Sequence, residues 1–394
     1  MSASVSAPRT RARSRRFTIP RWANIALAVI AFLVAAFVLP FLTEESSTFM
    51  NNLVLAAAYA VMALGLNIIV GFAGLLDLGY VAFYALGAFA MGYGGSLFLN
   101  VGGDEGVRVL AEGGAGLHVN FLIILVVAVV FTTLAGMLIG LPTLRLRGDY
   151  IAIVTLAFGE IIGRVAAQGD TISFNFLGWD QTLTAGRQGI TPIDKVDLPF
   201  IERFTSLNLR PWYWLALALF LLVLFVNFRL RDSRLGRAWI ALREDEVAAA
   251  SMGVPLVKTK LLAYGTGAAF GGLSGAFLAS YNNTVNADQF QFFFSILILA
   301  MVILGGLGSL WGVVIGAIVL SFINNLLIPE TFNDLPRQLG FDFDMSQINF
   351  GIYGFLLVAM MVLRPQGLLP ERRREQELTE GAESDDPVYE TRMQ

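Results

Sequence analysis

The sequence has 394 residues, of which 56% are hydrophobic and 14% are charged, and its formal net charge is −3. A typical soluble domain carries about a quarter charged residues, so this much apolar surface requires lipid as the solvent. With no cysteine and one histidine, the chain excludes disulfides, thiolate catalysis and iron–sulfur clusters, and we expect it to hold no metal. The balanced charge gives no sign of a nucleic-acid surface.

Continuous apolar runs dominate the sequence between residues 22 and 363. Each is close to the about 20 residues that an α-helix needs to cross a bilayer. Because the runs are continuous rather than alternating, they predict an all-α polytopic membrane protein with about ten transmembrane helices. The predicted spans are residues 22–42, 52–70, 74–98, 118–141, 149–167, 211–228, 258–281, 290–308, 311–328 and 347–363.

A basic stretch at residues 9–16 precedes the first apolar run. A signal peptide is the competing interpretation, but its apolar core would be shorter and a cleavage site of small residues would follow it. We therefore expect residues 1–21 to form a basic N-terminal tail and residues 22–363 to form one transmembrane domain.

Charge placement predicts the orientation of the spans. If the N-terminus is cytoplasmic, the basic residues within 9–16, 229–260 and 372–374 all fall on the cytoplasmic side. This asymmetry follows the positive-inside rule and predicts that both termini are cytoplasmic.

The excess of arginine over lysine is typical of a protein from a bacterium whose genome is rich in G and C.

Two long segments lie outside the predicted spans. Residues 168–210 form a polar exterior loop that is long enough for a small cap or a partner-docking surface. Residues 364–394 are charged and lack apolar periodicity, which predicts a disordered cytoplasmic tail. His118 lies where an exterior loop meets a span, and we expect it to be solvated there.

The segment 233–253, between two spans, has the pattern of an amphipathic helix. Ser233 or Asp232 could cap its start, and Gly253 would end it. It could lie on the bilayer surface or dock into a groove on a partner, and the residues alone leave both interpretations open. The acidic run 244–246 disfavours contact with anionic lipid headgroups.

Glycines gather in two regions, at residues 65–87 and at residues 305–316. Close packing of helix backbones is the simplest explanation for each glycine. Clustering also permits a helix to break and expose backbone groups to a cavity, and Gly71 to Gly74 with Asp77 form the better candidate for such a break. Asp77 would then cap a helix or line the cavity, and capping is the preferred interpretation.

Glu160 and Arg164 are charges within a predicted span. A lone charge in lipid is costly, so both side chains should face protein or water. Their spacing of four places them on one helical face, which predicts a structural ion pair. Contact with a zwitterionic substrate is the alternative interpretation.

Several motifs resemble those of permease subunits of branched-chain amino-acid ABC transporters, of the LivM type. The matching stretches are GLNIIVGFAG at 65–74, SRLGR at 233–237, LREDEVAA at 242–249, MG at 252–253, ILGGLGSLWG at 303–312 and RPQG at 364–367. Together they extend from the second predicted span to the tenth. The N-terminal extension and much of loop 168–210 carry none of these motifs.

The resemblance implies a permease in a bacterial inner membrane that imports leucine, isoleucine and valine. It implies two ATPase subunits, a paralogous permease and an extracytoplasmic binding protein as partners. It assigns ATPase coupling to the helix at 233–253, with Arg237, Arg243, Glu244, Asp245, Glu246 and Gly253 as candidate residues. The candidates for the substrate pathway are Asn67, Gly71, Gly74, Asp77, Gly305, Gly306 and Gly308.

The chain has no phosphate-binding loop, so ATP and magnesium would bind only to partner subunits, and the chain is not expected to be an enzyme. Related permeases for urea, short amides or other amino acids remain alternatives. A secondary transporter without an ATPase is a further alternative. A membrane-embedded enzyme would need convergent acids, a histidine or a metal set, and the sequence offers none.

Overall fold

The computed structural model describes residues 39–42, 47–99, 107–109, 116–143, 146, 149–176, 179–197, 204–205, 207–332, 349–364 and 366–369. The chain divides into two units, Met1–Glu44 and Glu45–Gln394. The first unit contributes the short helix α2 (Leu39–Leu42). The predicted tail 1–21 and the predicted span 22–42 otherwise lie outside the described residues.

The second unit is built from apolar helices, which confirms the all-α polytopic class. Among the described residues, six helices are long and apolar enough to cross a membrane, and three shorter apolar helices accompany them. The helices are α3 (Thr48–Asn67), α4 (Val81–Gly94), α5 (Phe121–Thr143), α6 (Asp149–Gln168), α7 (Arg210–Arg231), α8 (Arg234–Glu244), α9 (Glu246–Ser251), α10 (Leu256–Asn282), α11 (Phe292–Gly305), α12 (Leu310–Phe322) and α14 (Asn349–Leu363). The π-helices η2 (Ile68–Phe72) and η7 (Ile323–Phe332) extend α3 and α12.

The apolar helices coincide with the predicted runs from 52–70 onward, with one difference in extent. Residues 74–98 do not form one continuous helix, because the chain is irregular between η2 and the start of α4 at Val81. Apart from Asp77 the sequence here is apolar or glycine, so hydropathy alone could not place the interruption.

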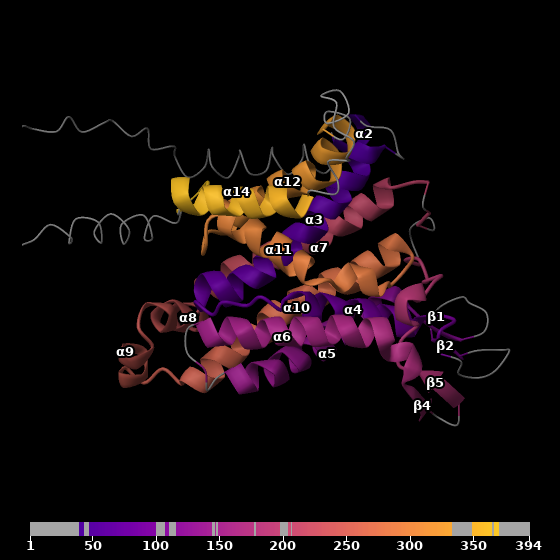
Figure 1. The fold of residues 1–394 in the computed structure, drawn as a ribbon, viewed down its shortest axis with the longest axis horizontal. Coiled ribbons are helices and arrows are strands. Elements are labelled where there is room, and N and C mark those ends of the chain that lie inside the picture. Colours follow the sequence, from indigo (N-terminus) through magenta and orange to yellow (C-terminus); the bar gives the residue numbers. More distant parts are fainter. Residues whose placement is uncertain are drawn as a thin grey trace, which may run out of the picture. The chain divides into compact units, whose positions relative to one another are not determined.

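Helix α10 forms the centre of this unit and packs against α3, α4 and α5 (Figure 1). Most of α3 and α10 is buried, whereas only a minority of α5, α6 and α7 is buried. Glycines let α4 and α10 approach closely, since a Cβ atom on Gly87 of α4 would lie 2.1 Å from the Gly272 carbonyl oxygen. The exposed side chains of α5 are apolar, among them Val126 and Leu138, as a lipid-facing helix requires.

Short strands lie at the end of the helices opposite to α8 and α9 (Figure 1). One sheet has the strand order β1 (Gly95–Ser96), β3 (Leu117–Val119), β2 (Val107–Val109), in which β3 is antiparallel to β1 and parallel to β2. The segment 168–210 contains the antiparallel pair β4 (Ser173–Phe176) and β5 (Trp179–Thr182), and the 3-10 turns η4 (Gly169–Thr171) and η5 (Gly186–Gln188). This predicted loop therefore has structure of its own.

Two predicted boundaries need correction. The segment 233–253 forms two helices rather than one, because Asp245 adopts extended backbone between α8 and α9. The predicted tail does not begin at residue 364, because the N–H of Leu368 donates to the carbonyl of Leu304 and that of Leu369 donates to the carbonyl of Gly305. Residues 370–394 lie outside the described residues.

Candidate functional site

The chain between η2 and α4, residues 73–80, overlaps the candidate helix break at Gly71 to Gly74 with Asp77, and we call it the linker. Three neighbouring helices hold it by hydrogen bonds. The N–H of Leu78 donates to Thr155 Oγ1 of α6, and the N–H of Val81, at the end of the linker, donates to Ser295 Oγ of α11. The hydroxyl of Tyr80 donates to the carbonyl of Gly267 in α10. The hydroxyls of Thr155 and Ser295 thus accept from backbone N–H groups that the interrupted helix leaves without a partner, and Tyr80 ties the linker to α10.

Arg243 of α8 joins the linker to the α8–α9 segment. Its guanidinium donates a 2.7 Å hydrogen bond to the carbonyl oxygen of Gly71, near the end of η2. Gly74 has φ +70, a conformation that favours glycine, and an added Cβ atom there would lie 2.5 Å from Arg243 Cγ. The structure therefore brings together a candidate coupling residue and two candidate pathway residues.

The turn between α11 and α12 packs against the same region. Asn67 is fully buried, and its side-chain oxygen accepts a 2.9 Å hydrogen bond from the N–H of Gly308. A Cβ atom on Gly71 would lie 2.7 Å from that same nitrogen. Gly306 lies against the RPQG segment, because a Cβ atom on Gly367 would be 2.5 Å from Gly306 Cα.

Asp77 is 2% exposed, and its Oδ1 accepts a 2.8 Å hydrogen bond from the N–H of Gly79. This is an Asx-type turn within the linker and not the predicted helix cap, since the N-cap of α4 is Tyr80 and no side chain caps that helix. Its Oδ2 is buried without a hydrogen-bond partner.

The candidate pathway residues are packed against protein. Gly305 lies against α12, where a Cβ atom would be 2.2 Å from the Gly312 carbonyl oxygen. None of the seven candidates lines either of the two polar cavities described below. The glycines thus allow close contact between backbones here, which is the simpler of the two explanations that their clustering allowed.

The two helices α8 and α9 form a hairpin that is fixed to the start of α10. The indole N–H of Trp239, which is fully buried, donates a 2.8 Å hydrogen bond to the carbonyl of Thr259. Lys260 is 3% exposed, and its ammonium group lies 2.6 Å from a carboxylate oxygen of Glu246. Sequence reasoning missed Lys260, although a lysine inside the predicted span 258–281 was the available signal.

The candidate coupling residues have distinct surroundings in this hairpin. Asp245 caps α9 by accepting hydrogen bonds from the N–H groups of Val247 and Ala248. Arg237 is exposed and donates to the carbonyl of Asp232. Glu244 is also exposed. Gly253 follows α9 with φ +86. The acidic run is therefore not one uniform charged surface.

The exposed tip of the hairpin carries apolar side chains. Val247 is 70% exposed and Met252 is 86% exposed. Val247 lies in α9 and Met252 directly follows it. This helix has six residues and is too short to cross a membrane. Both residues lie in motifs that the sequence analysis quoted, at 242–249 and 252–253, but their exposure at the tip was not predicted.

Glu160 and Arg164 lie on one face of α6, as their spacing predicted, and both are exposed. No ion pair between these two described residues is present, so the predicted structural pair is not found. Both instead line an open cavity of about 620 Å³, together with side chains from η5, η6 (Ala287–Phe290) and the start of α11. We call this the α6 cavity.

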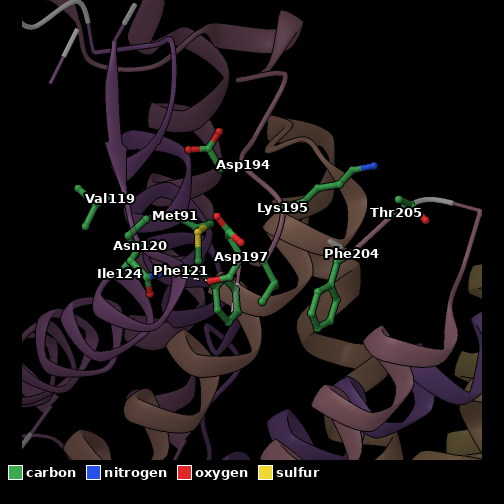
Figure 2. A pocket seen from close by; sticks show the side chains of 11 residues that line it. Met91, Val119, Asn120, Phe121, Ile124, Asp194, Lys195, Asp197, Phe204 and Thr205 are labelled. Atoms are coloured by element: carbon green, nitrogen blue, oxygen red, sulfur yellow. Dashed lines mark hydrogen bonds between the residues drawn. The ribbon is translucent and has the colours of Figure 1, made fainter. Parts of the chain in front are cut away.

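A second polar cavity, of about 280 Å³, lies at the strand end of the helices (Figure 2). It is lined by Met91, Val119, Asn120, Phe121, Ile124, Asp194, Lys195, Val196, Asp197, Phe204 and Thr205. In Figure 2 the side chain of Lys195 extends away from the carboxylates of Asp194 and Asp197.

His118 lies beside this second cavity and is only 4% exposed, so the expectation of a solvated histidine is wrong. Its Nδ1 lies 2.6 Å from a carboxylate oxygen of Asp194. Ser280 of α10 donates to the carbonyl of Asp194. The pairing arises because the segment 190–197 folds back over the strands, which no local pattern indicates. In the described part of the chain, no group of three or more His, Asp or Glu side chains could hold a metal ion.

Several apolar helices of spanning length, with polar structure at both ends, define a multi-pass membrane protein. The family described as "Branched-chain amino acid transport system / permease component" matches residues 48–363, and the chain belongs to that family. It is 36% identical, over 376 residues, to the high-affinity branched-chain amino acid transport system permease protein LivM of Escherichia coli (strain K12), a match that covers 90% of this chain and 77% of that protein.

Two more distant relatives complete the comparison. A probable branched-chain amino acid transport permease protein LivM of Methanocaldococcus jannaschii is 27% identical over 80% of this chain and 91% of its own length. The high-affinity permease protein LivH of Escherichia coli (strain K12) is 23% identical over 81% of this chain and 93% of its own length. No solved structure matches the chain significantly.

Proposed function

We propose that this chain is the membrane-spanning permease subunit of an ABC importer for leucine, isoleucine and valine. Two separate ATPase subunits would bind ATP and magnesium, and an extracytoplasmic binding protein would deliver the substrate. The names of the LivM relatives, which specify branched-chain amino acid transport, support this substrate class. LivM and LivH of one bacterium both match this chain, which supports a paralogous permease as a further partner.

The observation that carries the proposal is the exposed apolar tip of the α8–α9 hairpin. Val247 and Met252 present apolar surface on a protrusion outside the spanning helices. Exposed apolar groups on a polar segment suit an apolar groove on a soluble partner. The concentration of arginine around this hairpin supports a cytoplasmic location by the positive-inside rule, where ATPase subunits would meet it.

The proposed energy transfer runs from the hairpin to the interrupted helix. Closure of the ATPase subunits would displace α8 and α9, and Arg243 would pass the displacement to the carbonyl of Gly71. Because Trp239 and Lys260 also fix the hairpin to α10, the central helix would move with it. The result would be a shift between two packings of the spanning helices.

The proposed orientation places the chain in a bacterial inner membrane with both termini in the cytoplasm. The strand end of the helices, with most of the segment 168–210 and the cavity of Figure 2, then faces the extracytoplasmic side. This end would receive the binding protein. The charged side chains in its lining, Asp194, Lys195 and Asp197, suit contact with a soluble partner.

Co-purification with the ATPase subunits tests the docking surface. Val247→Asp with Met252→Asp should abolish co-purification, because charges replace the apolar contacts, while the permease still inserts into the membrane. Leu207→Asp is the matched control, since Leu207 is also apolar and 79% exposed but lies in the segment before α7, at the opposite end of that helix. Unchanged co-purification of the double variant would remove the docking proposal.

Transport by reconstituted proteins separates the alternatives. The complex should take up leucine only with ATP and the binding protein present. Uptake by this chain alone would identify a secondary transporter instead. Competition with urea and acetamide tests the remaining substrate classes, because neither should displace leucine from the binding protein.

A further inference from the structure

One stripe of α6 is exposed along its whole length but changes character halfway. Its half nearer the hairpin presents Tyr150 and Ile153, which are apolar. Its half nearer the strands presents Glu160, Arg164 and Gln168, which are polar or charged, and the apolar Ile161. The change occurs on a helix that is long and apolar enough to cross a membrane.

Lipid cannot be the neighbour of the polar half. Intramembrane charges face protein or water because lipid provides no partner for them. No ion pair between the described residues Glu160 and Arg164 neutralises them, and both are exposed. The outer half of this stripe must therefore face water or another subunit, while the inner half can face lipid or close against apolar protein.

The α6 cavity supplies the water-accessible space beside this stripe. It is lined by Glu160, Arg164 and Gln168 of α6, by Arg187 and Asp288, and by three phenylalanines of η6 and α11. Its volume of about 620 Å³ is within the about 300–1,000 Å³ that small-molecule sites occupy. The cavity thus combines charges of both signs with three phenylalanine side chains at the mouth of the spanning region.

This combination matches one class of solute. An α-amino acid carries a carboxylate, an ammonium group and a side chain, which for the branched-chain members is apolar. Arginine binds a carboxylate through paired N–H groups, and a carboxylate accepts from an ammonium group. Gly163 brings the opposite wall close, because a Cβ atom there would lie 3.0 Å from the carbonyl oxygen of Phe290.

We propose that the α6 cavity is the entry site that receives the zwitterionic amino acid after its release from the binding protein. Arg164 binds the carboxylate of the amino acid, Glu160 binds its ammonium group, and the phenylalanine wall contacts its apolar side chain. This assignment rests on the proposed function and adds to it the location of the solute. It places the solute on α6 rather than on the packed glycine clusters.

Cysteine accessibility tests whether water reaches this face. The natural chain has no cysteine, so single cysteines can be placed without altering other thiols. In the complete transporter, Gln168→Cys and Arg164→Cys should react with a charged, membrane-impermeant methanethiosulfonate reagent added from the extracytoplasmic side. Ile161→Cys is the matched control, because Ile161 is 52% exposed on the same helix but does not line the cavity.

Protection then tests for the solute itself. Leucine should slow the labelling of Gln168→Cys, whereas leucinamide, which lacks the carboxylate, should protect less. Labelling of Gln168→Cys no faster than that of Ile161→Cys, or no protection by leucine, would overturn the site. Because Gln168 is assigned no charge contact, this arm does not depend on the stability of the charged variants.

Transport kinetics test the assigned roles. Arg164→Gln should raise the KM for leucine at least about tenfold, as expected for a lost charge-assisted hydrogen bond, with kcat within about twofold. Arg164→Lys should recover part of the loss. An unchanged KM in Arg164→Gln would refute the role of Arg164. Leucine uptake by the cysteine-free parent tests the proposed function separately, since its absence would reject that function rather than the location of the site.

Discussion

Arg243 donates a hydrogen bond to the carbonyl oxygen of Gly71, and this bond connects the hairpin to the place where the α3–η2 helix stops. The last carbonyl groups of a helix have no partner within it and carry partial negative charge. A guanidinium group is therefore well suited to satisfy one of them. The contact unites two features that lie 172 residues apart in the sequence.

Replacing Arg243 with alanine should uncouple transport from ATP hydrolysis. The variant loses the bond to Gly71, whose carbonyl is then left without this partner, and we expect leucine uptake to fall at least about tenfold, the change that corresponds to about 1.4 kcal/mol. Uptake and ATPase rates of the reconstituted complex would measure this effect. Arg229→Ala is the control, since Arg229 is an exposed arginine in the last turn of α7 and should leave the ratio of uptake to hydrolysis unchanged.

Gly74→Ala should destabilise the linker. Alanine at φ +70 costs about 1–2 kcal/mol in backbone conformation, and its Cβ atom would also displace the Arg243 side chain. We expect a lower apparent melting temperature in detergent. The control is Gly354→Ala in α14, where an added Cβ atom meets nothing within 4 Å and helix propensity improves. Equal melting temperatures for the two variants would contradict the strain at Gly74.

Charge reversal at Glu246 should affect folding, whereas reversal at Glu244 should act mainly at the surface. Glu246→Lys places a second ammonium group beside Lys260, which is buried, and leaving that buried donor without its partner costs about 1–3 kcal/mol. Glu246→Gln keeps a hydrogen-bond acceptor and should be milder. Thermal unfolding of the detergent-solubilised variants would rank them, and a Glu246→Lys variant as stable as Glu244→Lys would contradict the buried pair.

Asn67→Ala should loosen the contact between η2 and the α11–α12 turn. The change removes the acceptor of the Gly308 N–H inside a fully buried region and leaves a cavity, at a cost of about 1–3 kcal/mol. Protease sensitivity of the segment 305–309 should increase. Asn52→Ala provides a comparison, because Asn52 is equally buried in α3 but its side chain makes no hydrogen bond, so its loss should be tolerated better.

Sequence patterns predicted the helices well where local chemistry decides them. Ser233 caps α8 as predicted, by accepting a hydrogen bond from the N–H of Gly236. The turn after α9 contains Gly253 as predicted. The division at Asp245 was missed, because an acidic run resembles a solvated helix face, and only the backbone shows that Asp245 ends α8 and begins α9.

The candidate sites depended on contacts between distant segments, and sequence reasoning was weaker there. The spacing of Glu160 and Arg164 predicted their shared face, but the α6 cavity depends on η5 and η6, whose positions no local pattern gives. The glycine motifs allowed both close backbone packing and a helix break that exposes backbone groups to a cavity. The motifs alone could not show that the glycines here are packed against protein. Lys260 shows the same limit, because its partner Glu246 lies in another helix.

The anchoring of Trp239 and Lys260 has a mechanical consequence. A hairpin attached only through its two chain connections could move without displacing the spanning helices. This one is attached at both helices to α10, through a buried indole and a buried ammonium group. Displacement of its tip would therefore tilt or shift α10. The helices packed around α10 would move with it as one rigid group.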